Sequence, residues 1–145
     1  MIDVINYKPE HIEKIVKREV FKHDDNMGKT INTLLELNQA VVKTIVSGED
    51  IVAIVGLTYI HKGVVEVWSV TSDLVKKYGI SYFRAVLTLL RMAQDKLGIH
   101  RFQMTMRQDF EVGFKWAESL GFFRESVMWK YGPDKSNVYM YVRFV

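Results

Sequence analysis

Glu66 is a carboxylate inside the apolar stretch Val64 to Val70, which is of the type that forms a β-strand. Side chains alternate between the two faces of a strand, so Glu66 should face away from its neighbours Val65 and Val67. A carboxylate whose surroundings raise its pKa toward neutrality can accept a proton from an ammonium group. Glu66 is therefore a carboxylate whose chemistry depends on how far the strand buries it. The competing interpretation is a solvent-facing residue or an ion-pair partner of a Lys or Arg.

A second candidate site lies where the spacing of apolar residues changes to that of a helix. The segment reads Lys76-Lys77-Tyr78-Gly79-Ile80-Ser81. Backbone N–H groups at the start of a helix lack internal partners and bind anions such as pyrophosphate, and glycine allows close approach. Lys76 and Lys77 are then either phosphate ligands or a solvated helix start. Tyr78 either covers a ligand or packs at the beginning of the helix.

Other chemistries find little support. The chain has no cysteine, which excludes disulfides, thiolate metal sites and cysteine nucleophiles. The four histidines are widely separated, and none forms a pair at metal-binding spacing. His23 with Asp24 and Asp25 comes nearest to a ligand group, and a solvated loop is the preferred interpretation. No serine stands in a Gly-x-Ser-x-Gly setting, so hydrolase chemistry has no support. We expect no metal site.

The elements that would position these residues follow from hydrophobic periodicity. Apolar residues three and four apart predict helices, whereas alternation and β-branched runs predict strands. The expected strands cover residues 2–7, 40–46, 51–60, 64–70, 102–106, 127–131 and 138–145. The expected helices cover residues 9–21, 27–37 and 110–120, and a long helix whose period begins at Leu74 and whose apolar face runs from Ile80 to Leu97. The order is therefore β-α-α-β-β-β-α-β-α-β-β.

Length and composition bound the remaining choices. A chain of 145 residues with 48% hydrophobic residues predicts a single packed domain over residues 1–145. The net charge of +3 is mild and spread along the chain, so no nucleic-acid partner is expected. No apolar stretch approaches the roughly 20 residues that span a bilayer, and the N-terminus lacks the pattern of a secretion signal. We therefore expect no membrane partner and a cytoplasmic protein.

Over essentially the whole chain, this order of elements resembles the GNAT superfamily of acetyl-coenzyme A-dependent N-acyltransferases. Two segments carry the resemblance. Val64 to Val70, followed by Lys76 to Ser81, is similar to the family's fourth strand and the Gln/Arg-x-x-Gly-x-Gly/Ala loop that opens its third helix. Asp109 to Phe122 is similar to the family's fourth helix, which runs into Leu-Gly-Phe, here residues 120–122.

The resemblance implies an α/β (α+β) fold with a mixed, mostly antiparallel sheet of about seven strands and about four helices. It also implies a splay between strands four and five, where the family places coenzyme A. Gly79 takes the central glycine position, Lys76 the Gln/Arg position, and Ser81 stands where Gly or Ala is usual. The backbone of Val70 or its neighbour would hold the pantetheine, Gly79 to Ser81 the pyrophosphate, and Glu66 would be the base.

The chain departs from the family pattern at the position of the general acid. In many active members a tyrosine four residues before the glycine of Leu-Gly-Phe protonates the departing thiolate, and here that residue is Ala117. The asparagine common at the start of the segment is also missing, with Gln108 and Asp109 nearby. Three tyrosines on the last strands could replace the acid or serve as core or surface residues. They are Tyr131, Tyr139 and Tyr141.

A narrower likeness concerns the GNAT-like proteins of short-tailed bacteriophages, one group of which comprises internal virion proteins. It is carried by Trp68-Ser69-Val70-Thr71-Ser72-Asp73, the basic helix and the short final strand pair. The resemblance thus implies an N-acetyltransferase that transfers an acetyl group from acetyl-coenzyme A to an unidentified amine or protein acceptor. The alternative is a catalytically degenerate GNAT-fold phage protein with a structural or virion-assembly role, whose partner would be a second copy or a virion protein.

Overall fold

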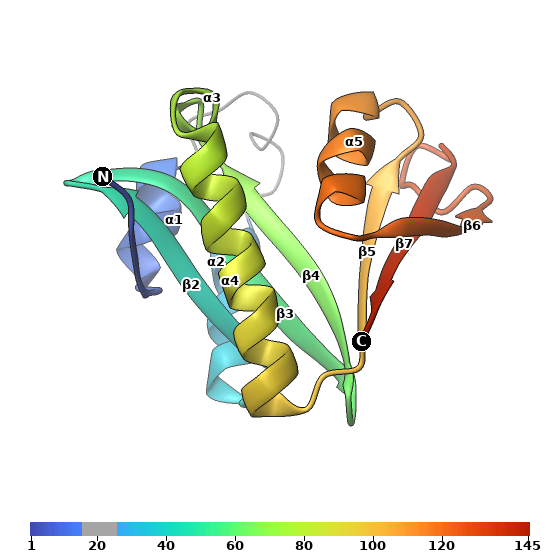
Figure 1. Cartoon of the computed structure of the whole chain (residues 1–145), viewed down its shortest axis with the longest axis horizontal. Coiled ribbons are helices and arrows are strands. Elements are labelled where there is room, and N and C mark those ends of the chain that lie inside the picture. The colour runs from blue at the N-terminus through green and yellow to red at the C-terminus, as the bar shows by residue number, and fades with distance from the viewer. Residues whose placement is uncertain (16–25) are drawn as a thin grey trace. The chain divides into compact units, whose positions relative to one another are not determined.

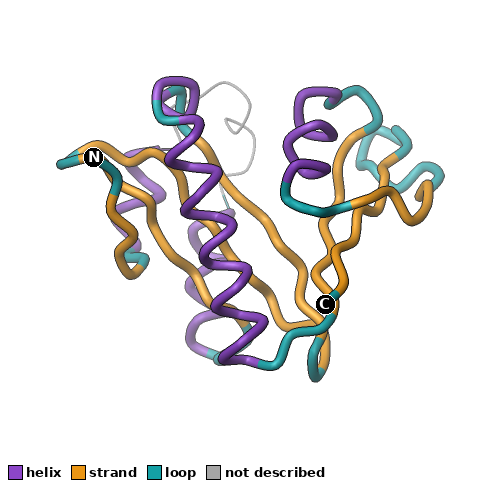
Figure 2. The backbone as a smooth tube through the Cα atoms, viewed as in Figure 1, coloured by secondary structure: helices purple, strands orange, loops and turns teal. Residues whose placement is uncertain are grey.

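The computed structural model describes residues 1–15 and 26–145, which contain seven strands and five helices (Figures 1 and 2). The strands are β1 (Asp3–Asn6), β2 (Ala40–Ser47), β3 (Asp50–His61), β4 (Val64–Thr71), β5 (Arg101–Arg107), β6 (Phe123–Met128) and β7 (Val138–Phe144). The helices are α1 (Pro9–Ile15), α2 (Met27–Glu36), α3 (Leu74–Lys77), α4 (Gly79–Leu97) and α5 (Glu111–Ser119). None of these helices combines the length and apolarity needed to cross a bilayer.

The seven strands form one sheet in the order β1-β2-β3-β4-β5-β7-β6. The neighbours β1–β2, β2–β3, β5–β7 and β6–β7 pair antiparallel. Strands β4 and β5 instead run parallel, which requires a crossover connection, and α3 and α4 lie in that connection. The expected mixed, mostly antiparallel sheet of seven strands is confirmed.

The β4–β5 ladder is short. It comprises three residue pairs, from Val64↔Arg101 to Glu66↔Gln103, although β4 has eight residues and β5 has seven. The ladder therefore ends at Glu66, before either strand ends. This short ladder agrees with the splay expected between the fourth and fifth strands.

The chain divides into two compact units, of which the first comprises Met1–Tyr59 and Val67–Leu90. In this unit α1 and α2 lie on one face of the strands and the first part of α4 on the other (Figure 1). Gly56 on β3 leaves room for the indole of Trp68 on β4, because a Cβ at residue 56 would lie 2.0 Å from that ring. The indole N–H of Trp68 donates to the hydroxyl of Thr58 at 2.9 Å.

The second unit comprises Ile60–Glu66 and Arg91–Val145. Helix α5 packs on the face of β7 that carries Tyr139 and Tyr141. Phe114 of α5 stacks on Tyr141, with ring centroids 5.5 Å apart and an interplanar angle of 12°. Phe102 and Tyr141, both almost fully buried, lie on the same face of the sheet, and the fully buried Val142 lies on the other face. The opposite face carries the side chains that alternate with Phe102 along β5, namely Arg101 and Gln103.

Two boundaries differ from the sequence-based expectation. Residues 74–77 form a separate helix, α3, although the helical period that begins at Leu74 predicted one long helix. The sixth strand begins at Phe123 instead of residue 127, because Gly121, with φ +89°, ends the preceding helix and lets the chain enter the sheet at once. Helix α1 is described only to Ile15. Its expected continuation, and the group His23-Asp24-Asp25, lie outside the described residues.

Candidate functional site

The start of α4 supplies backbone hydrogen-bond donors. Tyr78 separates α3 from α4, and its carbonyl accepts the amide of Tyr82 at 2.8 Å, the i to i−4 bond that opens the α4 ladder. The amides of Gly79, Ile80 and Ser81 precede that bond, so they are the first-turn donors that an α-helix leaves without an intrahelical acceptor. The expected anion-binding segment therefore stands at a true helix N-terminus.

Gly79 has no structural reason to be glycine. Its φ is not positive, and no atom lies within 4 Å of the position that a Cβ would occupy. Glycine in a helix is less favourable than alanine by roughly 0.5–1 kcal/mol, so the fold alone would be better served by alanine here. The residue is exposed, and the space beside its backbone is open to a ligand.

Lys76 and Lys77 occupy the last turn of α3, where the helix dipole favours cations. The two lysines therefore lie at the end of one short helix, and not within the first turn of the next as a helix start would require. Helix α3 forms because Ser72 fixes Leu74, the first residue of the helix. The hydroxyl of Ser72 donates to the Ile51 carbonyl at 2.8 Å and accepts a hydrogen bond from the Leu74 amide at 3.3 Å. Both lysines are exposed, and neither forms an ion pair with a described residue.

Tyr78 is tied to its surroundings through its ring and its hydroxyl. The hydroxyl of Ser47, at the end of β2, donates to the phenol oxygen at 3.0 Å, and the Lys77 ammonium lies 5.3 Å from the ring centroid. The Ser47 hydrogen bond, followed by the charge of Lys77, lowers the pKa of Tyr78 below its usual value. These contacts anchor the α3–α4 junction to β2, which agrees with the packing interpretation of Tyr78.

Val70 and Ile80 differ in what they can offer a ligand. The side chain of Val70 is 2% exposed and belongs to the core cluster of the first unit, so only its backbone is available for binding. Ile80, in contrast, is 72% exposed in the first turn of α4. Ser81 beside it is also exposed. Val70 and the segment 76–81 all belong to the first unit.

Glu66 belongs to the second unit and lies in β4 between two buried valines, with its own side chain half-buried on the other face. Burial raises the pKa of Glu66 above its usual value of 4.5. No described residue forms a hydrogen bond or ion pair with its carboxylate. The expectation that Glu66 faces away from Val65 and Val67 agrees with this burial pattern. Its role as a base remains a prediction.

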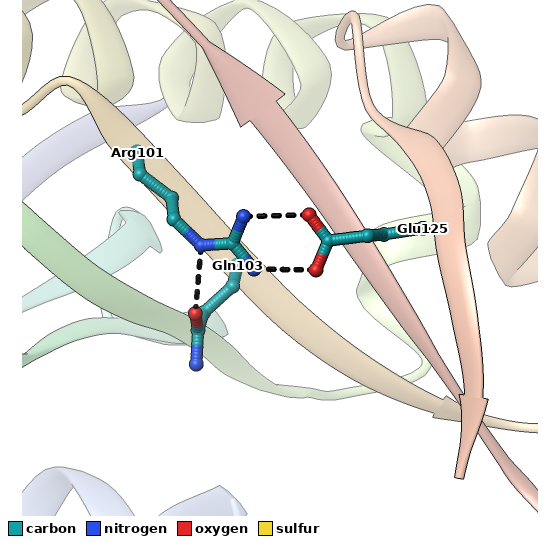
Figure 3. Close-up of polar contacts among 3 residues, drawn as sticks. All are labelled: Arg101, Gln103 and Glu125. Atoms are coloured by element: carbon teal, nitrogen blue, oxygen red, sulfur yellow. Dashed lines mark hydrogen bonds and ion pairs between the residues drawn. The ribbon is translucent and has the colours of Figure 1, made fainter.

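Gln103, the strand partner of Glu66, belongs to a chain of polar contacts that was not foreseen in the sequence. Figure 3 shows this chain, which joins Gln103, Arg101 and Glu125. The guanidinium of Arg101 binds Glu125 through two hydrogen bonds, both 2.7 Å long, and its Nε donates to Oε1 of Gln103 at 3.1 Å. This pairing raises the pKa of Arg101 and lowers the pKa of Glu125. Alternation places Arg101 and Gln103 on one strand face, but no local pattern indicates Glu125 as their partner.

The position of the missing general acid is apolar and closed. Ala117 has no exposed surface, and neighbouring Phe114 stacks on Tyr141. The ring of Tyr139 lies under the guanidinium of Arg124 at 3.7 Å, and the hydroxyl of Tyr141 is 3.5 Å from an Arg124 nitrogen. Tyr131 is 62% exposed in the β6–β7 loop. Two of the three candidate tyrosines are therefore occupied by packing around Arg124.

Metal chemistry gains no support from the described part of the chain, in which no three His, Asp or Glu side chains gather in a metal-binding arrangement.

Comparison with known proteins finds proteins that are similar in structure but none that is similar in sequence. No family model matches the sequence, and no curated protein matches it. Solved structures match over nearly the whole chain. RimL, a ribosomal L7/L12 alpha-N-protein acetyltransferase in complex with coenzyme A, aligns with a TM-score of 0.82 at 14% identity, covering 99% of this chain and 94% of RimL.

Two further matches agree. A chimera of the spermidine N-acetyltransferase SpeG from Vibrio cholerae and hSSAT aligns with a TM-score of 0.78 at 10% identity, covering 99% and 95% of the two chains. A GNAT-family acetyltransferase from Streptococcus pneumoniae aligns with a TM-score of 0.76 at 14% identity over 100% of both chains. At these identities the likeness concerns the fold, and the fold of this chain is that of the GNAT acetyltransferases.

Proposed function

We propose that this protein is an N-acetyltransferase that takes an acetyl group from acetyl-coenzyme A and transfers it to an amine. The observation that carries the proposal is the start of α4, where Gly79 leaves open space beside three first-turn amides. The fold gives this position no need for glycine, whereas a pyrophosphate lying against the backbone does. The likeness to a neighbour in complex with coenzyme A supports binding of this donor.

The residues present fit such a donor. The amides of Gly79, Ile80 and Ser81 would hold the pyrophosphate, and the exposed ammonium groups of Lys76 and Lys77 would add charge-assisted hydrogen bonds. The backbone near Val70, beyond the paired part of β4, would hold the extended pantetheine. Acetyl-coenzyme A supplies an activated acetyl thioester when bound.

Glu66 performs the proton transfer in the proposed reaction. Its raised pKa makes the carboxylate a better proton acceptor than an ordinary glutamate. It takes a proton from the acceptor ammonium, and the free amine then attacks the thioester carbonyl while the carbon–sulfur bond breaks. The second proton that the nitrogen loses on becoming an amide passes to water.

Departure of the thiolate proceeds without a side-chain acid at position 117, since Ala117 is apolar and buried. A thiolate leaves readily, and water can protonate it. Loss of a positioned acid costs about 10² to 10⁴ in rate, so the proposed enzyme is slow. The second hypothesis from the sequence is a GNAT-fold phage protein without turnover. Such a protein would have the same scaffold but would not transfer the acetyl group.

Calorimetric titration with coenzyme A and acetyl-coenzyme A tests the binding half of the proposal. A ligand at 100 times its dissociation constant stabilises the folded state by about 2.7 kcal/mol, so a thermal shift provides an independent readout. Release of free thiol in a screen of amines and peptides tests the transfer half. Absence of binding at millimolar concentrations refutes the proposed function, whereas binding without acetylation of any acceptor favours the non-catalytic hypothesis.

A further inference from the structure

We propose that Gln103 selects the amine substrate of this reaction, because its side-chain NH2 group donates a hydrogen bond to an oxygen atom of that substrate. The substrate is then an α-amine adjacent to a carbonyl group and not a polyamine. The inference rests on the proposed function, because it concerns the acceptor that Glu66 deprotonates. It is built entirely from residues of the second unit.

Glu66 and Gln103 stand side by side on one face of the sheet. They are Cα partners in the parallel β4–β5 ladder, and they form its last pair. Neighbouring strands lie about 4.8 Å apart, and side chains of paired residues emerge on the same face. A ligand that reaches the carboxylate of Glu66 therefore also lies within reach of the Gln103 amide.

The orientation of the Gln103 amide is fixed by Arg101. A guanidinium carries donors only, so the group that accepts from Arg101 Nε must be the amide oxygen of Gln103. The NH2 group consequently points away from Arg101 (Figure 3). Arg101 is itself held in place by the two hydrogen bonds to Glu125 and by the Phe144 ring, whose centroid is 5.7 Å away.

Two polar groups on this face are left without a protein partner in the described part of the chain. One is the Glu66 carboxylate, and the other is the NH2 group of Gln103. They do not bond to each other although their residues are paired. The Glu66 carboxylate, which accepts hydrogen bonds, thus lies beside the Gln103 NH2 group, which donates them, and both are available to a ligand.

This pair matches one class of amine. An α-amine next to a carbonyl offers N–H donors to Glu66 and an oxygen to Gln103. A polyamine offers donors only, so it would leave the Gln103 NH2 group unpaired at a cost. The carboxylate next to this site gives a polycation little help, since Glu125 is paired with Arg101 through two hydrogen bonds.

The α-amine could come from a free amino acid or from the N-terminus of a peptide, so the test uses both. The acceptors are alanine amide, a short peptide with a free N-terminus, isopropylamine and spermidine. The variants are Gln103→Met, which removes the whole amide, and Gln103→Glu, which keeps an oxygen for Arg101 but removes the donors. Gln108→Met is the matched control, because Gln108 is exposed and, among residues 1–15 and 26–145, it is bonded through its backbone amide alone, to the carbonyl of Asn137.

We expect both Gln103 variants to raise KM for alanine amide and the peptide by roughly 2- to 12-fold, the range for one neutral hydrogen bond, with Gln103→Met leaving kcat nearly unchanged. The KM for isopropylamine and the dissociation constant of coenzyme A should change less than twofold, and Gln108→Met should match the parent. A higher kcat/KM for spermidine than for the peptide overturns the inference, as does an equal effect of Gln103→Met on KM for alanine amide and isopropylamine.

Binding of the same peptide, measured by calorimetry without any donor, gives a readout that needs no turnover. The dissociation constant should weaken by the same factor in both Gln103 variants, and unchanged binding or no binding of the peptide refutes the inference. Failure of coenzyme A to bind refutes the proposed function instead, so the two failures are distinguishable.

Discussion

Replacing Gly79 by alanine should raise the stability of the protein and weaken its binding of coenzyme A. A Cβ at this position meets no atom within 4 Å, and the φ angle is not positive, so the methyl group costs nothing in the folded state. Gly→Ala at such a compatible position stabilises by about 0.4–1 kcal/mol, chiefly by restricting the unfolded chain. For a domain of this size the melting temperature should rise by roughly 1–4 °C.

Binding should respond in the opposite direction. The same methyl group would intrude between the helix start and the pyrophosphate, and overpacking of one methyl group typically costs about 1–3 kcal/mol. We therefore expect the dissociation constant of coenzyme A to rise roughly 5- to 150-fold. The larger, β-branched side chain of Gly79→Val should abolish binding. Thermal unfolding without ligand and calorimetric titration with coenzyme A measure the two effects separately.

Gly98 provides the matched control at the other end of α4. A Cβ there also meets no atom within 4 Å, but its φ is +65°. Gly98→Ala should therefore lower the stability by about 1–2 kcal/mol, the cost of a left-handed conformation, and leave coenzyme A binding unchanged. If Gly79→Ala binds coenzyme A as tightly as the parent, the placement of the pyrophosphate is wrong. If it is less stable than the parent, the geometry described around Gly79 is wrong.

Three further outcomes follow from the site and the fold. Neutralising Lys76 and Lys77 together should weaken coenzyme A binding by roughly 1–3 kcal/mol without changing the melting temperature by more than a few degrees, and unchanged affinity in calorimetry would mean that both are only solvated. Glu66→Gln should reduce acetylation while leaving coenzyme A binding intact. Because the pKa of Glu66 is raised above 4.5, acidification protonates this base at a higher pH than it would an ordinary glutamate. The rate of the parent should therefore fall on the acidic side of its pH profile, and this fall should be absent in the variant. Gly56→Ala should destabilise the protein by about 1–3 kcal/mol in chemical unfolding, because the new methyl group would lie 2.0 Å from the Trp68 ring; wild-type stability would contradict that packing.

Much of the fold followed from local patterns. The order of strands and helices was predicted because hydrophobic periodicity records which face of each segment is buried. The alternation of Val65, Glu66 and Val67 likewise indicated a carboxylate on the opposite face, and the burial of the two valines agrees with it. The start of α4 was located from the change of period and from Gly79.

The boundaries of the elements and the shortest elements were harder to predict from the sequence. Helical period was expected from Leu74, but the separation of the four-residue helix α3 from α4 was not, because α3 depends on the contacts of Ser72 with β3. The sixth strand was placed too late because its pairing with β7 contains an irregularity between Arg124 and Ser126, which breaks simple alternation. In both cases the deciding interaction comes from another strand.

The sequence by itself determined the elements, their order and the chemical types available at the candidate site, since these depend on residues close together in the chain. Only the tertiary structure decided that the space beside Gly79 is open and that position 117 is closed. Only the tertiary structure, too, joined Arg101 to Glu125, 24 residues away, and thereby turned the NH2 group of Gln103 away from Arg101 on the strand face that it shares with Glu66. The physical reason is that such contacts depend on strand register and packing between distant segments, which local periodicity does not encode.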